Sequence, residues 1–432
     1  MKKVLIIGGG FGGLECALGL ANQPGIDVTL IDRTNHHLFH PLLSQVASAS
    51  LTAPDIAQSI RQILCDANNV TVLMDEITEL NAAEHTATSA TGHVHHYDYL
   101  VLATGARTGY FGNDHWAQHT LCLKSLADAQ DIRRTVLTNL EKAELSTDPT
   151  ERQRLMTIAI VGGGPTGVEL AGAFADLMHR SLRNNFRNID TTELRIVLIE
   201  GSERILEAYS EDQSAYARRR LEKLGVNVRC NTRVTDIQPQ MLHFKEGEPL
   251  TAAAIIWAAG VAASSLAAQL ATPADRGGRI APLPDLSVPG FPHAFVAGDL
   301  VSLRDAKQQP IPGIAPAAMQ MGRHIAKIIC KEISSRDPID VAARPAFRYT
   351  DKGFMAIIGK NHAVVKSGGI ELQGFIAWLM WLFIHILFLV GFRNKLAVLL
   401  GWAFAYLRDN PSARVVAQPV DLSRVTPTNH SK

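Results

Sequence analysis

The chain has 432 residues, with 42 lysines and arginines against 41 aspartates and glutamates, and a formal net charge of +1. This length suffices for two or three domains, and the balanced charge excludes the basic footprint of a nucleic-acid-binding protein. Its five cysteines are scattered without a Cys-x-x-Cys pair, which argues against a zinc site, a dithiol redox centre and a disulfide framework. We therefore expect no metal and a reducing, cytosolic environment.

The first predicted element is a strand at Val4–Ile7 that leads into a glycine-rich turn. Gly8, Gly10 and Gly13 have the G-x-G-x-x-G spacing, and an Ala/Leu-rich stretch typical of a helix follows. Such glycines permit a tight turn and the close approach of a pyrophosphate, which binds at the helix N-terminus. The start Met1-Lys2-Lys3 resembles a signal peptide, but the short apolar run and the lack of a cleavage site favour a strand.

The next predicted strand, Asp27–Asp32, ends in an acid that can accept hydrogen bonds from ribose hydroxyls. The alternative is a solvated strand end. A histidine-rich stretch, His93–His96, lies where a hairpin turn is expected, and we interpret it as a surface turn rather than a metal site. The first nucleotide unit closes with Tyr97–Gly105, a buried-type strand that ends in Ala-Thr-Gly.

A second copy of the fingerprint occupies Ile158–Gly167 and again joins an apolar run to a helical stretch. The strand Leu194–Glu200 also ends in an acid, after a spacing longer than the usual ~20 residues. We assign the extra residues, 179–192, to an extended helix end and a loop. Glu200 would repel a 2′-phosphate and so favours NADH over NADPH, although the nearby Arg204 weakens that argument. Two such units suggest two dinucleotides held face to face, with electron transfer between them.

The remaining segments define the predicted architecture. The second unit closes at Ala254–Val261, and a proline-rich segment then leads to Phe295–Asp299, a short strand ending in Gly-Asp. We expect this segment to return to the first unit. The predicted fold is therefore α/β, with two Rossmann-like dinucleotide-binding domains, the second inserted in the first. The expected domains are 1–112 with 286–335, then 113–285, and a C-terminal region, 340–432.

The C-terminal region begins with predicted strands and continues with two apolar segments, Gly374–Phe392 and Leu396–Leu407. The first reaches the lower limit for a transmembrane helix, but one span would leave the second unexplained. We favour two amphipathic helices lying on or partly in one leaflet through residues 374–410. Aromatic rings favour the water–lipid interface, where we expect Trp378, Trp381, Trp402 and Tyr406. Cations favour the lipid headgroups, near which we expect Arg393, Lys395 and Arg408. A transmembrane span and a soluble core or dimer interface are the alternatives.

With these motifs in view, the chain resembles the type II NADH dehydrogenases, non-pumping single-subunit NADH:quinone oxidoreductases of the two-dinucleotide-binding-domain flavoprotein superfamily. The more specific motifs are Asn35–Leu43, Gly162–Leu170, Ile256–Val261 and Gly313–Gln320. Tyr349–Gly353 and Leu389–Leu396 look like the bacterial branch. The resemblance implies a membrane quinone as electron acceptor. It also implies attachment to the cytoplasmic face of the bacterial inner membrane, and makes a homodimer plausible.

The resemblance assigns FAD to the first domain (1–112 and 286–335) and NADH to the second (113–285). The implied FAD contacts are Gly8, Gly10, Phe11, Gly12, Gly13, Asp32, Arg33, Ala103, Thr104, Gly105, Gly298, Asp299 and Ala318. The implied NADH contacts are Gly162, Gly164, Pro165, Thr166, Gly167, Glu169, Glu200, Ala259 and Gly260.

Two residues carry implied catalytic roles. Gln320 matches the last position of the family's A-Q-x-A-x-Q quinone motif, whose first glutamine is replaced here by Pro316. Glu169 matches an acid found near the nicotinamide and quinone regions, and we expect it to help manage protons. Its alternative role is that of an early-helix acid favoured by the helix dipole.

Two other functions stay open on the sequence. A sulfide:quinone oxidoreductase has a similar architecture but needs paired active cysteines, for which Cys122 and Cys330 are the conceivable pair. A non-catalytic, membrane-attached NADH-sensing flavoprotein is also compatible, because Pro316 alters the quinone motif.

Overall fold

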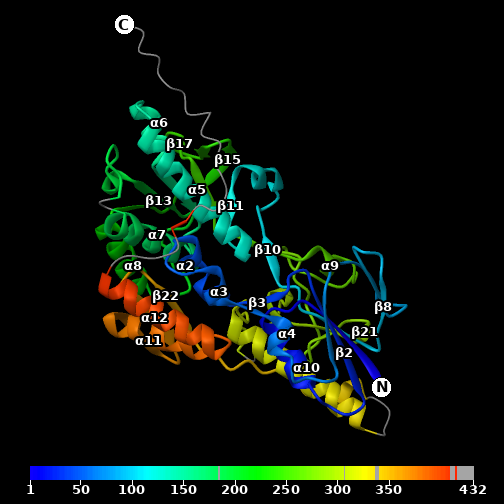
Figure 1. Cartoon of the computed structure of the whole chain (residues 1–432). Coiled ribbons are helices and arrows are strands. Elements are labelled where there is room, and N and C mark those ends of the chain that lie inside the picture. The colour runs from blue at the N-terminus through cyan, green and yellow to red at the C-terminus, as the bar shows by residue number, and fades with distance from the viewer. Residues whose placement is uncertain (183–184, 306, 336–339, 409–413, 416–432) are drawn as a thin grey trace. The chain divides into compact units, whose positions relative to one another are not determined.

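The computed structural model describes residues 1–182, 185–305, 307–335, 340–408 and 414–415 (Figure 1). They divide into two compact units, each built from separate stretches of the chain. The first unit contains residues 1–38, 57–107 and 261–352, and the second contains 39–56, 108–260 and the described residues from 353 onward. The α/β fold expected from the sequence is confirmed, and each unit holds its own sheet, mainly parallel in the first unit and fully parallel in the second.

The first unit is built on a six-stranded sheet in the order β20-β21-β9-β1-β2-β5. The strands are β1 (Lys2–Ile7), β2 (Ile26–Asp32), β5 (Val70–Met74), β9 (Tyr99–Leu102), β20 (Ser287–Val288) and β21 (Phe291–Val296). All neighbours are parallel except β20 and β21. Buried parallel strands need apolar side chains on both faces, and Val4–Ile7 are at most 4% exposed. Because β1, β9 and β21 are parallel neighbours, their carboxyl ends meet at one edge of the sheet.

Two long helices of this unit pack against each other with unusually small residues between them. They are α1 (Phe11–Leu20) and α10 (Ala315–Ser334), blue and yellow in Figure 1. A Cβ atom on Gly322 of α10 would lie 2.1 Å from the carbonyl oxygen of Gly12, and one on Gly19 would lie 2.6 Å from the Ala326 Cβ. Glycine and alanine at these positions let the two backbones approach to direct contact.

Smaller elements complete the first unit. They are the pair β3 (His36–Leu38) and β4 (Ala57–Ser59), helix α4 (Ile60–Ile63), and the antiparallel sheet of β6 (Ile77–Asn81), β7 (Thr86–Ser89) and β8 (Val94–His96). The prediction of a turn at the histidine-rich stretch is wrong for most of it, because Val94–His96 pair with β7 as strand β8 and the hairpin turn precedes His93. No cluster of three or more potential metal ligands occurs within the described part of the chain.

The second unit repeats the arrangement with a five-stranded parallel sheet in the order β11-β18-β12-β13-β14. The strands are β11 (Leu121–Cys122), β12 (Thr157–Val161), β13 (Arg195–Ile199), β14 (Val226–Arg229) and β18 (Ala254–Trp257). Its helices include α5 (Leu126–Leu145), α6 (Pro149–Leu155), α7 (Pro165–Asp176) and α8 (Glu211–Lys223), with the antiparallel strands β15 (Val234–Gln238), β16 (Met241–Phe244) and β17 (Leu250–Thr251). A π-helical turn, Leu177–Ser181, extends α7 at the place predicted for an extended helix end.

Residues 39–56 belong to the second unit, although they lie within the sequence range expected for the first nucleotide domain. They form two short helices, α2 (Leu43–Ala47) and α3 (Ala53–Ile56), and α2 packs against α5 and α7. Residues 261–285, expected in the second domain, lie in the first unit. The compact units therefore do not coincide with the nucleotide-domain boundaries expected from the sequence, which stay predictions.

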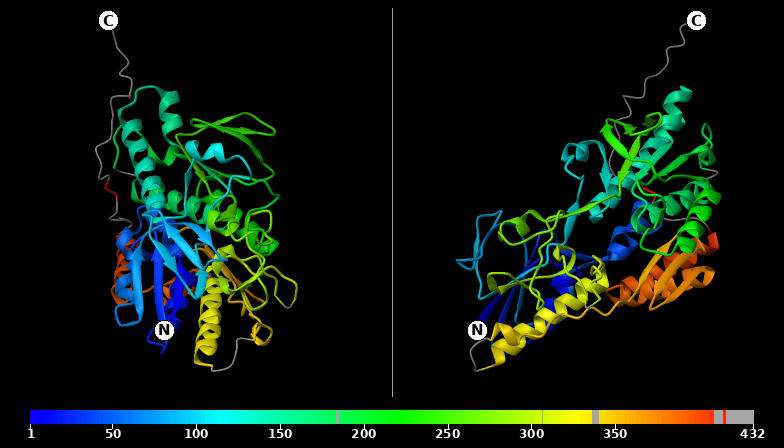
Figure 2. Two further views of the ribbon diagram at one scale, coloured as in Figure 1. Left: turned by 90° about the vertical axis from the view of Figure 1, so that its right-hand side faces the viewer. Right: turned by 180° about the vertical axis from the view of Figure 1, so that it is seen from behind.

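The C-terminal region forms strands and then helices, in the predicted order. The strands β22 (Phe354–Ile357), β23 (Ala363–Ser367) and β24 (Ile370–Gly374) make an antiparallel sheet, and α11 (Phe375–Phe388) and α12 (Phe392–Arg408) follow it. The two helices pack side by side, as the orange and red ribbons of Figures 1 and 2 show. Among the described residues, no helix is both long enough and apolar enough to cross a membrane.

The interpretation of the tail tryptophans as a group at the lipid interface is wrong for two of them. Trp378 and Trp381 are 9% and 0% exposed, because they pack inward, while Phe375, Phe383 and Leu387 lie on the outer face of α11. The cations differ as well, since Arg393 is exposed but the Lys395 ammonium donates to the Leu387 carbonyl (2.9 Å). The side chains of Tyr406 and Arg408, and residues 409–410, lie outside the part that the structure describes.

Candidate functional site

The first fingerprint forms a turn that only glycine fits. Gly8 has a φ of 104°, which L side chains rarely adopt, and a Cβ on Gly13 would lie 1.9 Å from the Gly8 carbonyl oxygen. Helix α1 starts directly after Gly10, which supplies no side-chain cap. A Cβ on Gly10 would meet nothing within 4 Å. The turn therefore presents an open side and uncapped backbone N–H groups, which fits a pyrophosphate at the helix N-terminus.

Asp32 is tied into this turn rather than being a solvated strand end. The Gly9 N–H donates to Asp32 Oδ2 (2.6 Å), while the Thr34 N–H and hydroxyl both donate to Oδ1 (2.7 Å). A carboxylate has about four acceptor positions, so Asp32 keeps capacity for ribose hydroxyls. Gly9, which the sequence analysis did not single out, donates the first of these bonds, and a Cβ there would lie 2.5 Å from Cδ1 at the end of the Ile60 side chain. The sequence signal for Gly9 was the run Gly8–Gly10, because the motif requires glycine only at the first and third of these positions.

The other expected FAD contacts of the first unit gather at the same sheet edge. The Ala103 N–H donates to the Ile7 carbonyl (2.8 Å) and the Ala297 N–H to the Leu102 carbonyl (3.1 Å), which aligns the ends of β1, β9 and β21. Thr104, Gly105, Gly298 and Asp299 follow these strand ends, and Ala318 lies in the first turns of α10. The Thr104 hydroxyl oxygen is buried without a hydrogen-bond partner among the described residues. A buried polar atom of this kind fits a site that a polar cofactor completes.

A buried histidine supports the first turn and was missed by the sequence analysis. His37 Nδ1 lies 3.0 Å from the Gly9 carbonyl oxygen, and the His37 ring meets the Phe11 ring edge-on at 4.9 Å. His37 is 2% exposed, whereas Arg33 lies at the surface. The sequence signal was the run Asn35–Leu43, which carries the family resemblance but gives no hint of which histidine turns inward.

The second fingerprint reproduces this geometry in the second unit. Gly162 has a φ of 116°, and a Cβ on Gly167 would lie 1.9 Å from the Gly162 carbonyl oxygen. Helix α7 begins at Pro165, directly before Thr166, and Gly164 precedes it without a side-chain cap. The Ala258 N–H donates to the Val161 carbonyl (2.7 Å), which brings Ala259 and Gly260 to the edge where this turn lies.

Glu200 plays the part that Asp32 plays in the first unit. Its Oε2 accepts the Gly163 N–H (2.6 Å) and its Oε1 accepts the Ser202 N–H (2.8 Å). Arg204, whose charge weakened the preference for NADH, instead donates to the carbonyls of Tyr209 (3.1 Å) and Glu207 (3.0 Å). The Arg204 guanidinium is therefore hydrogen-bonded to carbonyl groups of its own loop.

Burial strongly perturbs the carboxyl group of Glu169 in the second unit. The residue is partly exposed, but its carboxyl group is surrounded by protein. The Ser44 hydroxyl donates to Oε2 and the Ile357 N–H to Oε1, both at a long 3.4 Å. Burial raises the pKa of Glu169 to about 8, against the smaller opposing effect of these two donors. Glu169 is thus protonated at neutral pH, unlike an ordinary early-helix acid.

Gln320, the other expected catalytic residue, lies in the first unit and is held by the backbone. Its Nε2 donates to the Thr350 carbonyl (3.0 Å) and its Oε1 accepts the Thr350 N–H (2.9 Å). One amide hydrogen and one lone pair remain for a ligand. Pro316 stands in the first turn of α10, where a missing N–H costs no intrahelical bond. Glu169 and Gln320 thus belong to different compact units.

Comparisons with known proteins agree on one family. Residues 2–322 match the pyridine nucleotide-disulphide oxidoreductase family. The type II NADH:quinone oxidoreductase Ndh of Mycobacterium tuberculosis is 40% identical over 416 residues, covering 94% of this chain and 88% of that protein. The chain belongs to the type II NADH:quinone oxidoreductases. It is accordingly an oxidoreductase enzyme, and the alternative of a non-catalytic NADH sensor is not supported.

Solved structures show the same fold. NDH2 from Plasmodium falciparum in complex with NADH has a TM-score of 0.87 and 22% identity, covering 96% of this chain and all of that one. The sulfide:quinone oxidoreductase from Aquifex aeolicus has a TM-score of 0.71 and 16% identity, covering 92% of each chain. At these identities the likeness concerns the fold and does not separate the two activities.

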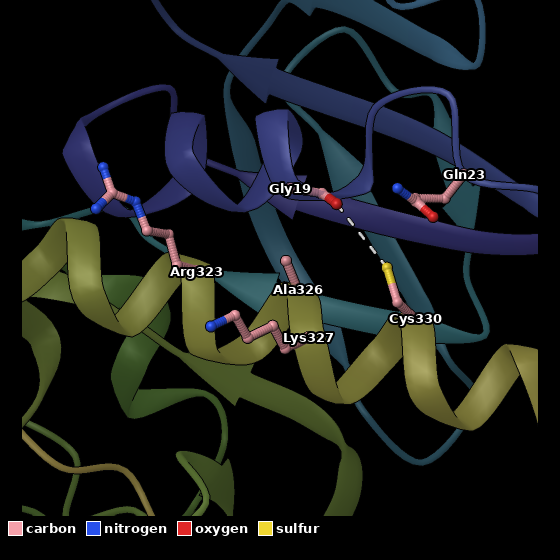
Figure 3. A pocket seen from close by; sticks show the side chains of 6 residues that line it. All are labelled: Gly19, Gln23, Arg323, Ala326, Lys327 and Cys330. Carbon is pink, nitrogen blue, oxygen red and sulfur yellow. Dashed lines mark hydrogen bonds between the residues drawn. The ribbon is translucent and has the colours of Figure 1, made fainter.

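The cysteines of this type II oxidoreductase do not favour sulfide chemistry. Burial raises the pKa values of the Cys122 and Cys330 thiols, so both stay protonated and are poor nucleophiles. Figure 3 shows Cys330 reaching from α10 toward Gly19 on α1, where its thiol faces the Gly19 carbonyl at 3.8 Å. The surrounding pocket of about 390 Å³ contains none of the expected site residues.

Proposed function

We propose that this protein oxidises NADH and reduces a membrane quinone, with FAD as its resident electron carrier and without pumping protons. The observation that carries the proposal is the duplicated glycine cradle, each copy locked by an acid at the end of the next strand. Family membership supplies the direction of electron flow. Bound FAD would supply the chemistry, taking up a hydride from NADH and releasing two electrons to the quinone.

We assign FAD to the first cradle and NADH to the second. The FAD domain would comprise 1–112 and 286–335, the NADH domain 113–285, and the membrane-associating region 340–432. Support comes from the side chains at the two strand ends. The Glu200 carboxylate and the engaged Arg204 guanidinium leave no free cation beside the second ribose position within the described loop, which favours NADH over NADPH.

We assign Glu169 the role of holding a proton for the quinone step. A quinone that gains two electrons also takes up two protons, and a carboxyl group that is protonated at neutral pH can donate one. The support is the location of Glu169 among protein atoms, where burial keeps its pKa near 8. We assign Gln320 a hydrogen bond to a quinone carbonyl, through the amide hydrogen that Thr350 leaves unused.

We further propose that residues 374–410 attach the protein to the cytoplasmic face of a bacterial plasma membrane, and that the protein is a homodimer. The support for attachment is the exposed apolar side of α11 and α12. Its members are 36–81% exposed: Phe375, Ile376, Leu379, Met380, Phe383, Leu387, Phe388, Phe392, Leu396, Leu399, Leu400 and Phe404. So large an apolar surface marks an interaction site, and a lipid-soluble quinone gives it a physical purpose.

Anaerobic stopped-flow spectroscopy of the purified yellow protein tests the activity. NADH should bleach the flavin absorbance at about 450 nm, which is the usual maximum of oxidised flavin. A water-soluble quinone should then restore it. Bleaching without recovery would indicate a different acceptor. Bleaching by sulfide but not by NADH would overturn the proposal in favour of the sulfide:quinone reaction.

A further inference from the structure

The short helix α2 carries two neighbouring polar side chains that are buried against different partners. All five residues of α2 are buried, and Ser44 and Gln45 are only 4% and 9% exposed. Leu43, Val46 and Ala47 supply its apolar remainder. Buried polar groups are costly unless they are hydrogen-bonded; Ser44 directs its polar atom toward α7, and Gln45 directs its polar atom toward α12.

Gln45 fastens α2 to the tail helix. The Trp402 indole N–H donates to Gln45 Oε1 at 2.7 Å, a short distance for an N–H···O bond. The Trp402 ring lies 5.7 Å from Trp381, which stacks on the buried His385 at 3.9 Å. Trp402 is thus held on the inner side of α12, opposite the exposed Leu400 and Phe404.

Ser44 joins the same short helix to Glu169. Its hydroxyl lies 3.4 Å from Glu169 Oε2, at the outer limit of a useful hydrogen bond. Because such a bond weakens steeply with distance, a shift of α2 by a few tenths of an ångström decides whether it exists. We propose that Gln45 and Trp402 form a positioning pair through which helix α12 holds α2, and with it the Ser44 hydroxyl, against the carboxyl group of Glu169. This inference rests on the proton-holding role proposed above for Glu169.

The surroundings of Glu169 leave few other groups that could control its protonation. The neighbouring elements α2 and β22 contain no ionisable side chain. Tyr209, which is 2% exposed, interacts electrostatically with Glu169, and its pKa is raised, chiefly by burial. On α7 itself, Asp176 accepts the Lys360 N–H and pairs with Arg180. The Ser44 hydroxyl is thus the donor that a neighbouring helix can move.

The test measures the protonation of Glu169 directly in the full-length, FAD-loaded protein. Infrared spectra recorded against pH should contain a protonated-carboxyl band that is missing in Glu169→Gln. Loss of a donor destabilises the carboxylate, so Ser44→Ala should raise the midpoint by about half a pH unit. Trp402→Phe keeps the ring but removes the donor to Gln45, and should shift the midpoint in the same direction. The double variant should show no larger shift than Ser44→Ala alone.

A matched control removes a hydrogen-bonded indole elsewhere in the same unit. Trp116 donates to Asp236 and is 4% exposed, so Trp116→Phe should leave the midpoint unchanged. No shift in Trp402→Phe, a downward shift, or a shift that adds to that of Ser44→Ala would overturn the proposed positioning pair.

The quinone half-reaction, followed against pH in the same variants, separates this inference from the proposed function. A moved infrared midpoint with unmoved quinone kinetics would retain the positioning pair but remove Glu169 as the proton source. Concerted movement of both would support the two proposals together.

Discussion

At the scale of single residues, the two cradles use the same device with different acids. A carboxylate at the end of the second strand binds the N–H of the middle glycine, Gly9 or Gly163, at 2.6 Å in both units. That glycine in turn has an apolar side chain, Ile60 or Ile205, where its Cβ would lie. The acid therefore fixes the turn as well as offering oxygens to a ribose.

Gly163→Ala should weaken NADH binding without releasing FAD. The new Cβ would lie 2.8 Å from Ile205 Cγ2 and 3.0 Å from the Glu200 side chain, so the turn or the acid must move. A loss of about 1.4 kcal/mol would raise the Kd for NADH roughly 10-fold. The dependence of the stopped-flow rate of flavin reduction on NADH concentration measures this change in Kd. The neighbouring Gly201→Ala has open space around its Cβ and should bind normally; equal weakening in both variants would contradict the argument.

Glu169→Gln should slow reoxidation of the reduced enzyme by quinone by roughly 100-fold, the contribution of one general acid. In the native enzyme this rate should fall as the pH rises through about 8, because the carboxyl group then loses its proton. The variant should lack that titration, and reduction of the native enzyme by NADH should not follow it. Stopped-flow traces from pH 6 to 10, roughly two units on each side of that pKa, decide the matter.

The same carboxyl group makes stability depend on pH. Its pKa is raised on folding, so native Glu169 holds a proton that the unfolded chain releases near pH 4.5. Its contribution to stability is fully present below that pH and is lost as the pH rises toward about 8. The melting temperature of Glu169→Gln minus that of the native protein should therefore increase from about pH 5 to about pH 8. The expected increase is roughly 2–4 °C for each kcal/mol of stability that the native protein loses. A constant difference would show that the carboxyl group is not desolvated.

At the scale of elements, the contact between α1 and α10 determines the position of the first cradle. Gly322→Ala would set a Cβ 2.1 Å from the Gly12 carbonyl oxygen, and two backbones cannot yield as a flexible side chain would. We expect a loss of about 2 kcal/mol of stability and reduced retention of FAD. Thermal unfolding and flavin content measure both. Gly401→Ala in α12, whose Cβ would meet only Leu51 at 3.8 Å, is the helical control and should be neutral or slightly stabilising.

At the scale of the whole molecule, the tail combines an internal and an external surface. Its inward aromatic side chains pack around His385, whose pKa burial lowers to about 4, while its outward face is apolar. Phe383→Glu and Leu387→Glu should weaken binding to lipid vesicles at least 10-fold, since each removes about 1.5–3 kcal/mol of apolar transfer energy. Reduction by NADH should be unchanged. Sedimentation with lipid vesicles measures the binding. Met74 is similarly exposed on β5 of the first unit, and the control Met74→Glu should bind vesicles normally.

The sequence alone determined the two nucleotide cradles, their acids and the order of strands and helices in the tail. These features depend on local spacing, because a tight turn between a strand and a helix admits only glycine at set positions. The apolar length of the tail segments also predicted helices, but not which face of each helix turns inward, and so Trp378 and Trp381 were misplaced. Only the tertiary structure decided that, because inward packing depends on partners far away in the chain. The tertiary structure likewise decided the location of residues 39–56, the support of the first glycine turn by His37, and the hydrogen bonds from Ser44 and Ile357 to Glu169. Burial among distant segments, which no local pattern encodes, turns an ordinary helix acid into one that holds its proton at neutral pH.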